Sequence, residues 1–153
     1  MVWLLAQVNI GRLVAAPDDP RVRGFMDALN PVNVLAEASP GFVWRLQSAE
    51  GDATAIRISD DERDIINVSV WSSMDALTDF VHRSDHASYL RRRRDWFEVF
   101  GSVYQALWWV PAGHRPTESE AIARIEMLAE HGPSAEAFTF SRPFPPPDDT
   151  LVD

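Results

Sequence analysis

The chain of 153 residues contains no cysteine. Disulfide bonds and thiolate metal sites are therefore excluded, and nothing in the composition indicates an oxidising compartment. No stretch approaches the roughly 20 apolar residues needed to cross a membrane. The N-terminus also lacks the basic region and long apolar core of a signal peptide. We therefore expect a single cytoplasmic domain that does not interact with membranes.

Positive charge is also scarce. The 14 Lys and Arg residues are outnumbered by 23 Asp and Glu residues, which gives a formal net charge of −9. Because phosphate groups repel an acidic surface, this charge argues against nucleic acid as a partner. The sequence contains no Gly-rich phosphate loop, serine nucleophile elbow or zinc motif. We therefore expect neither a nucleotide cofactor nor a bound metal ion.

The spacing of apolar residues predicts the order of strands and helices. Alternation predicts strands at residues 3–10, 42–47, 65–71 and 103–110. Helical spacing predicts helices at 22–38, 74–81 and, after a break at 84–85, up to about residue 100, with a last helix after the capping-box sequence at 117–120. Proline should kink or restart the first helix at Pro31. Residues 55–58 form a short strand or a loop, and 138–140 could add an edge strand.

This β-α-β-β-α-β order is that of a ferredoxin-like α+β domain, with an antiparallel sheet, helices on one face and a C-terminal helix extension. We expect the domain to occupy residues 1–142, followed by a Pro-rich acidic tail at 143–153. Helices on one face would leave the other face of the sheet as a large apolar patch. Such a patch favours a homodimer that buries it.

Two of the predicted strands carry one apolar face and one mixed face. In the third strand, the mixed face consists of Ile65, Asn67, Ser69 and Trp71, because successive side chains point to opposite sides. In the first strand, Gln7 and Asn9 share a face in the same way. A mixed face of this kind favours either a cavity lining or a subunit contact.

Residues 82–114 combine histidine, arginine and tryptophan in a way that suits a pocket for a planar organic molecule. His82 and His86 lie one helical turn apart and converge on a ligand if the helix is continuous, whereas a break at Ser84 separates them. If the two histidines have no functional role, each is a hydrogen-bonded, partly buried imidazole at a helix junction. In the run of four arginines at 91–94, only Arg93 lies on the face of the two histidines, where it could reach into the pocket or across a dimer. Alternatively, the run forms a solvated face paired with acidic neighbours such as Asp95 and Glu98.

Six tryptophans are many for a chain of this length. Trp71, Trp44 and Trp109 are candidates for the walls of a pocket, and each could equally belong to a large core. Trp108 and Trp109 point to opposite faces of the fourth strand. His114 lies in a loop whose Gly and Pro residues set the turn, so we expect a structural role for it.

The sequence resembles an uncharacterised bacterial domain family of the dimeric α+β barrel superfamily. The segments that carry the resemblance span nearly the whole chain: 5–10, 40–47, 70–71, 80–86, 91–97, 107–114 and 137–140. The resemblance implies a ferredoxin-like fold whose sheet pairs with a second copy. The superfamily includes antibiotic-biosynthesis monooxygenases, haem-degrading oxygenases and small isomerases or dehalogenases.

The resemblance also implies a set of site residues. Haem-degrading members carry an Asn on the first strand, a Trp ending the third strand and a His on the next helix, and Asn9, Trp71 and either His82 or His86 occupy similar places. Cofactor-independent monooxygenases of the superfamily use Asn and Trp in the pocket as well. The second histidine and the four arginines depart from both patterns.

Three functional hypotheses follow. The first is an enzyme of the monooxygenase, isomerase or lyase type that acts on an aromatic or polyketide-like compound without a cofactor. In it, His86 is the general acid or base, Asn9 donates to an oxyanion and Arg93 holds an enolate or carboxylate. The substrate-binding residues are Trp71, Trp44, Trp109 and His82. The second hypothesis is a non-catalytic protein that binds a hydrophobic ligand, and the third is a haem-binding or haem-degrading protein.

Overall fold

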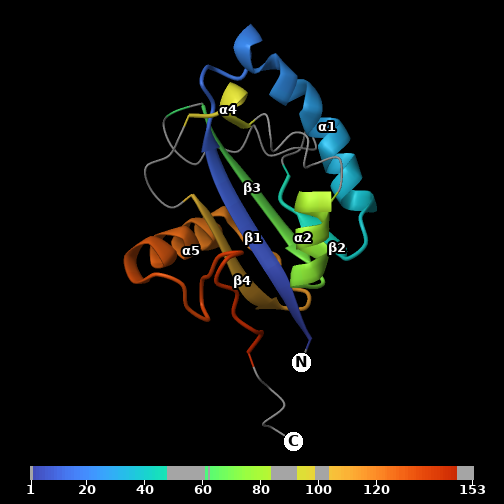
Figure 1. Cartoon of the computed structure of the whole chain (residues 1–153), viewed down its shortest axis with the longest axis vertical. Coiled ribbons are helices and arrows are strands. Elements are labelled where there is room, and N and C mark those ends of the chain that lie inside the picture. The colour runs from blue at the N-terminus through green and yellow to red at the C-terminus, as the bar shows by residue number, and fades with distance from the viewer. Residues whose placement is uncertain (1, 48–60, 62, 84–92, 99–103, 148–153) are drawn as a thin grey trace, which may run out of the picture.

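The computed structural model describes residues 2–47, 61, 63–83, 93–98 and 104–147. They form one antiparallel sheet of four strands in the order β2-β3-β1-β4 (Figure 1). The strands are β1 (Trp3–Arg12), β2 (Phe42–Arg45), β3 (Asp64–Trp71) and β4 (Gln105–Pro111). With the first and third strands in the centre, this is the strand order of the expected ferredoxin-like α+β fold, which is confirmed.

The helices also follow the expected order. They are α1 (Arg23–Ala38), which follows the 3-10 turn η1 (Pro20–Val22), then α2 (Met74–Arg83), α4 (Arg93–Trp96) and α5 (Glu118–His131). α1 runs through Pro31 without a restart. The expected features at residues 55–58 and 84–85 lie outside the described residues. None of the helices in the described part of the chain is long and apolar enough to cross a membrane.

Two helices begin with a serine or threonine cap, and the capping-box sequence at 117–120 predicts the second of them. The Ser73 hydroxyl accepts a hydrogen bond from the backbone N–H of Ala76, and the Thr117 hydroxyl accepts one from the N–H of Glu120, both at 3.1 Å. α5 ends at Gly132, whose φ of 76° lies in the left-handed region that glycine adopts without strain. Both helices therefore have a side-chain cap at the N-terminus, and α5 also has a glycine cap at its C-terminus.

Helices cover both faces of the sheet. α1 and α2 pack on the face that carries Leu5, Trp71 and Leu107. α5 packs on the opposite face, where it contacts the apolar side chains of β1, β3 and β4. The two crossover helices thus share one face as expected, and the C-terminal helix reduces the apolar area left exposed on the other.

The face under α5 is the main hydrophobic core. It consists of fully or nearly fully buried side chains from three strands and the helix: Ala6, Val8, Val68, Val70, Trp108, Val110, Ala121, Ile125 and Leu128. The indole of Trp108 is fully buried and donates from Nε1 to the Glu120 carboxylate at 3.0 Å. The other oxygen of that carboxylate lies 2.6 Å from Nε2 of His114. His114 therefore has the structural role expected for it, as part of the anchor of α5.

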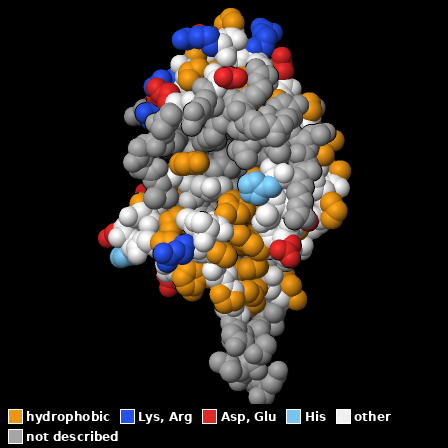
Figure 2. Space-filling model, in the orientation of Figure 1, with side chains coloured by type: hydrophobic (Ala, Val, Ile, Leu, Met, Phe, Trp, Pro, Cys, Tyr) orange, Lys and Arg blue, Asp and Glu red, His pale blue; other side chains and the backbone are white. Residues whose placement is uncertain are grey.

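The C-terminal segment extends the sheet and covers part of the face that α1 and α2 share. Phe138 and Leu107 exchange two backbone hydrogen bonds of 2.8 and 2.9 Å, so the expected edge strand is present as a single bridge to β4. Farther along, the carbonyl of Phe144 accepts a 2.9 Å hydrogen bond from the Trp109 indole. Figure 2 shows hydrophobic side chains gathered on the lower part of the visible face, where this segment runs.

Candidate functional site

A cavity of about 360 Å³ lies between the mixed face of the sheet and the helices α1 and α2. The mixed face that alternation predicts therefore lines a cavity. Its polar lining includes Gln7, Asn9, Asn67, Ser69 and Gln105. Its apolar lining includes Phe25, Phe42, Trp71, Phe80, Phe97 and Phe140. The volume is within the range of pockets that enclose small organic ligands.

A connected strip of polar side chains crosses the floor of the cavity. Gln7 lies at its centre and donates from Nε2 to Asn67 Oδ1 at 2.6 Å and to Ser69 Oγ at 2.7 Å. Its Oε1 accepts from Asn9 Nδ2 at 3.3 Å. The Trp71 indole N–H donates to the same Ser69 oxygen at 2.8 Å. Five side chains of two strands thus hold one another in fixed orientations.

The strip follows from the register of the two central strands. Gln7 lies opposite Ser69, and Asn9 lies opposite Asn67, in the antiparallel pairing of β1 with β3. Directly opposed side chains on one face of such a pair come within hydrogen-bonding reach. None of these four residues carries a charge, so the strip offers a ligand hydrogen bonds without a net charge.

Aromatic side chains form the end of the cavity next to the strip. Trp71 stacks on Phe80 of α2 with ring centroids 5.1 Å apart, and Phe42 meets Trp71 edge-on at 5.5 Å. Trp71 is only 1% exposed, and its N–H is occupied by Ser69. The indole therefore forms part of the packed cavity wall, and its hydrogen-bond donor is not available to a ligand.

Phe97 closes the opposite end of the cavity. Its ring lies directly over Gly11 of β1, where a Cβ atom would come within 2.5 Å of two ring carbons. Backbone hydrogen bonds of 2.8 Å, from Val14 to Trp96 and from Glu98 to Arg12, hold this segment against the end of β1. Gly11 is thus required by the close approach of the ring, and Phe97 determines how long the cavity is.

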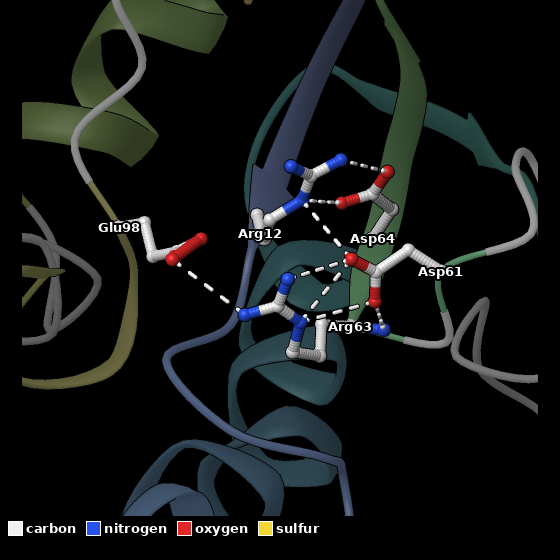
Figure 3. A network of polar contacts seen from close by, with 5 residues as sticks. All are labelled: Arg12, Asp61, Arg63, Asp64 and Glu98. Atoms are coloured by element: carbon white, nitrogen blue, oxygen red, sulfur yellow. Dashed lines mark hydrogen bonds and ion pairs between the residues drawn. The ribbon is translucent and has the colours of Figure 1, made fainter.

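A network of ion pairs connects the chain segments at the Phe97 end of the cavity (Figure 3). Arg12 makes a paired contact with the Asp64 carboxylate at 2.6 and 3.0 Å. Arg63 binds Asp61 at 2.7 Å and reaches Glu98 at 3.5 Å. The hydrogen bond from Arg63 lowers the pKa of Asp61 to about 2. The hydrogen bond and charge of Asp64 raise the pKa of Arg12. The network joins the ends of β1 and β3 to the segment that carries Phe97.

Three titratable side chains line the cavity in the described part of the chain: Arg45, His82 and Tyr104. Arg45 lies beside Ser69 across the β2–β3 pairing, and its Nε is 3.6 Å from the Glu37 carboxylate. His82, at the end of α2, meets Phe140 edge-on with ring centroids 6.1 Å apart. These residues line the same cavity as the uncharged strip. The described residues contain no group of three or more side chains able to hold a metal ion.

The structure brings three of the proposed site residues to the cavity: Asn9, Trp71 and His82. Trp44 packs with the core under α5 instead, because Val43 is an extra residue in β2 that changes which side chains face the cavity. Trp109 packs against Phe138, under the C-terminal segment. Neither tryptophan lines the cavity.

The other two proposed residues cannot be located in the cavity. His86 lies outside the described residues. The backbone of Arg93 begins α4, and its side chain is outside the described part.

Several lining residues were not among the proposed site residues: Gln7, Asn67, Ser69, Arg45 and Phe140. Alternation already placed the first three on the mixed face with Trp71, and that was the available signal. Identifying Gln7 as the central residue required the register of β1 and β3, in which Gln7 binds both Asn67 and Ser69.

The fold is similar to those of several solved structures. The cofactor-independent oxygenase SnoaB from Streptomyces nogalater is 17% identical, with a TM-score of 0.49, over 75% of this chain and 96% of that chain. A mutant of SnoaB is 15% identical, with a TM-score of 0.50, over 77% and 100% of the two chains. A Nitrosomonas europaea protein provisionally named an antibiotic biosynthesis monooxygenase is 11% identical, with a TM-score of 0.48, over 76% and 95%.

At these identities the similarity extends to the fold alone. No curated protein matches the chain in sequence. A family model, however, matches residues 4–152, which is nearly the full length. The chain therefore belongs to the family described as Domain of unknown function (DUF3291).

Proposed function

We propose that the protein is a small-molecule enzyme of the cofactor-independent oxygenase type, acting on a planar aromatic or polyketide-like compound. The observation that carries the proposal is the cavity, in which a hydrogen-bonded strip of uncharged polar groups lies between aromatic ends. The similarity of the fold to that of an oxygenase named as cofactor-independent is consistent with this assignment.

The cavity suits a reaction in which the substrate itself supplies the electrons. An acidic C–H of a CH2 group conjugated with a carbonyl loses its proton, and the resulting enolate transfers electrons to O2. One oxygen atom becomes a new carbonyl group and the other leaves as water, so that CH2 and O2 give C=O and H2O. The protein has to orient the rings, stabilise the enolate oxygen and accept one proton.

Side chains for the first two of these tasks line the cavity. Trp71 and Phe80 form the aromatic end of the cavity, against which the rings would lie. The amides of the strip provide hydrogen bonds, among them that of Asn9, whose Nδ2 already donates to Gln7. We propose His86 as the base, on its sequence position, and His82 as a cavity residue that contacts the substrate.

Oxygen uptake with anthrone as the probe tests the proposal, because its central CH2 group is activated by a carbonyl. We expect protein-dependent O2 consumption and one atom of label in the new carbonyl when ¹⁸O₂ is supplied. His86→Ala should lose turnover, and His82→Ala should mainly raise KM. His131→Ala, at an exposed position of α5, is the matched control and should behave like the parent.

Other outcomes assign the protein to a different class. Anthrone or a related compound that binds tightly and is recovered unchanged would indicate the non-catalytic binding protein. A rearranged or cleaved product without O2 uptake would indicate an isomerase or lyase. Full turnover in His86→Ala would remove His86 from the mechanism.

A further inference from the structure

Ser69 lies at the centre of the cavity floor, but the proposed function assigns it no role. It lies in the middle of β3, is 7% exposed and lines the cavity. Its neighbours across the sheet are Gln7 on β1 and Arg45 on β2. A hydroxyl group at this place is largely shielded from bulk water and lies within reach of Gln7, Trp71 and a ligand in the cavity.

The Ser69 hydroxyl oxygen accepts two hydrogen bonds, whereas its proton is donated to none of the described residues. A serine oxygen can accept two hydrogen bonds and donate one. One is accepted from the indole of Trp71 at 2.8 Å, and an indole N–H can only donate. The other is accepted from Gln7 Nε2 at 2.7 Å. Among the described residues, no acceptor receives the Ser69 proton, so it is directed at the cavity.

Gln7 keeps the Ser69 hydroxyl in the orientation in which its proton is directed at the cavity. Its Nε2 carries two protons, which go to Ser69 and to Asn67 Oδ1, and its Oε1 accepts from Asn9. Turning the amide over would place Oε1 against the Asn67 oxygen and Nε2 against the Asn9 amide nitrogen, so two of the three hydrogen bonds would be lost and only the one with Ser69 could persist, with Ser69 as its donor. Gln7 is 5% exposed, so water cannot easily replace the lost partners.

We propose that Ser69 donates its hydroxyl proton in a hydrogen bond to a carbonyl, enolate or phenolate oxygen of the ligand, with Trp71 and Gln7 fixing it as a donor. The inference rests on the proposed function, in that the ligand occupies the cavity. It narrows the ligand to planar compounds that carry an acceptor oxygen near the middle of one edge. A donor that needs no reorientation is effective at stabilising charge that develops on such an oxygen.

A pair of probes isolates this hydrogen bond. Fluorene and 9-fluorenone share one ring system and differ by a CH2 group in place of a carbonyl. Their dissociation constants are measured by tryptophan fluorescence, and the ratio of the two is compared within each variant, so that general damage to the cavity cancels. In Ser69→Ala we expect fluorenone to lose about tenfold in affinity relative to fluorene, because its buried carbonyl loses a donor.

Two further variants show whether the hydroxyl is responsible. Ser69→Thr keeps an O–H group and should keep the ratio of the parent. Ser72→Ala, at an exposed serine outside the cavity lining, should keep it as well. An unchanged ratio in Ser69→Ala, with both probes bound, would overturn the role of Ser69 while leaving the cavity as the ligand site. Failure of both probes to bind the parent would overturn the ligand class as well.

The carbonyl stretch of bound fluorenone provides a signal that a purely structural role would not change. In the parent it should lie at lower wavenumber than in cyclohexane, and in Ser69→Ala it should return toward the cyclohexane value. Gln7→Glu tests the positioning role of Gln7. A carboxylate there would accept the Ser69 proton, so the band should shift as in Ser69→Ala although the hydroxyl is present. A band that Gln7→Glu leaves unchanged would exclude that role.

Discussion

At the scale of single residues, Gly11 and Phe97 define one end of the cavity. Gly11→Ala should force the Phe97 ring away, because the new Cβ would lie 2.5 Å from two of its carbons. We expect a loss of about 1–3 kcal/mol in the free energy of unfolding, as is typical of overpacking. Urea denaturation measures this loss, and the affinity for 9-fluorenone should change at the same time because the length of the cavity changes.

Gly24→Ala is the matched control for this substitution. Its Cβ would lie 3.2 Å from the Trp96 ring, a much milder contact, and alanine is favoured over glycine in the helix α1. Adding Phe97→Ala to Gly11→Ala should remove most of the additional cost of Gly11→Ala in a double-mutant cycle. Additive effects in that cycle would show that the two residues do not interact.

Acid stability is a second property that depends on single residues. The pKa of Asp61 is lowered from 3.8 to about 2 by its hydrogen bond with Arg63. Its contribution to stability is therefore fully present above about pH 4 and is lost as the pH falls toward 2. Asp61→Asn should lower the free energy of unfolding at neutral pH and flatten its dependence on pH between 4 and 2.

Denaturant titrations of the parent and Asp61→Asn at a series of pH values measure this effect. Asp19 provides an independent comparison, because its pKa is also lowered by a hydrogen bond, from Arg21, at a separate place on the surface. The two substitutions should therefore have additive effects. Parallel curves for the parent and Asp61→Asn down to pH 2 would contradict the prediction.

At the scale of elements, α5 depends on one carboxylate for its attachment to the sheet. Glu120→Ala would leave the fully buried Trp108 N–H without an acceptor and free His114. We expect a cost of about 1–3 kcal/mol in the free energy of unfolding. Glu118→Ala is the control, since both glutamates lie in the first turn and interact similarly with the helix dipole. Equal effects of the two substitutions would show that the contact to Trp108 is unimportant.

The elements differ in how far the sequence predicted them. Alternation was sufficient for β1 and β3, because both strands have an uninterrupted period of two over their full pairing. It failed in β2, where a bulge between Phe42 and Trp44 places these residues on opposite faces, although a regular strand would place them together. A bulge depends on the pairing with β3 and leaves no clear pattern in the strand itself.

Prediction of the candidate site from the sequence has the same limit. The mixed face, with Asn9 and Trp71, could be read from the sequence because it needs only local periodicity. The central place of Gln7 could not, because it depends on which β3 residues lie opposite it. The position of α5 on the far face depends on a contact between Trp108 and Glu120 that spacing alone does not indicate.

At the scale of the whole molecule, we propose a homodimer. α5 leaves the β2–β3 half of its face only partly covered: Trp44 of β2 is partly buried there, as are Leu46 just after β2 and Ile10 of the neighbouring β1. A second copy would complete the burial of these side chains. Light scattering should give twice the 17.2 kDa mass of the chain, and Trp44→Arg should shift the protein toward the monomer.

The control for this variant is Val34→Arg, at a 54% exposed position of α1 outside the proposed contact. It introduces the same charge and should leave the mass unchanged. A monomer mass for the parent at micromolar concentration would rule out the homodimer, and a dimer that both variants preserve would move the contact elsewhere.

The polar strip lies wholly on the two central strands, whereas much of the remaining cavity wall comes from α1, α2 and the segment that carries Phe97. Chemistry and shape are therefore encoded in separate parts of the chain, and one can change while the other is kept. Libraries that vary the cavity-lining positions Leu29, Val32 and Asn33 of α1 should alter which compounds are accepted without loss of the reaction. By the same logic, relatives with an identical strip and different helices would be expected to process different molecules in the same way.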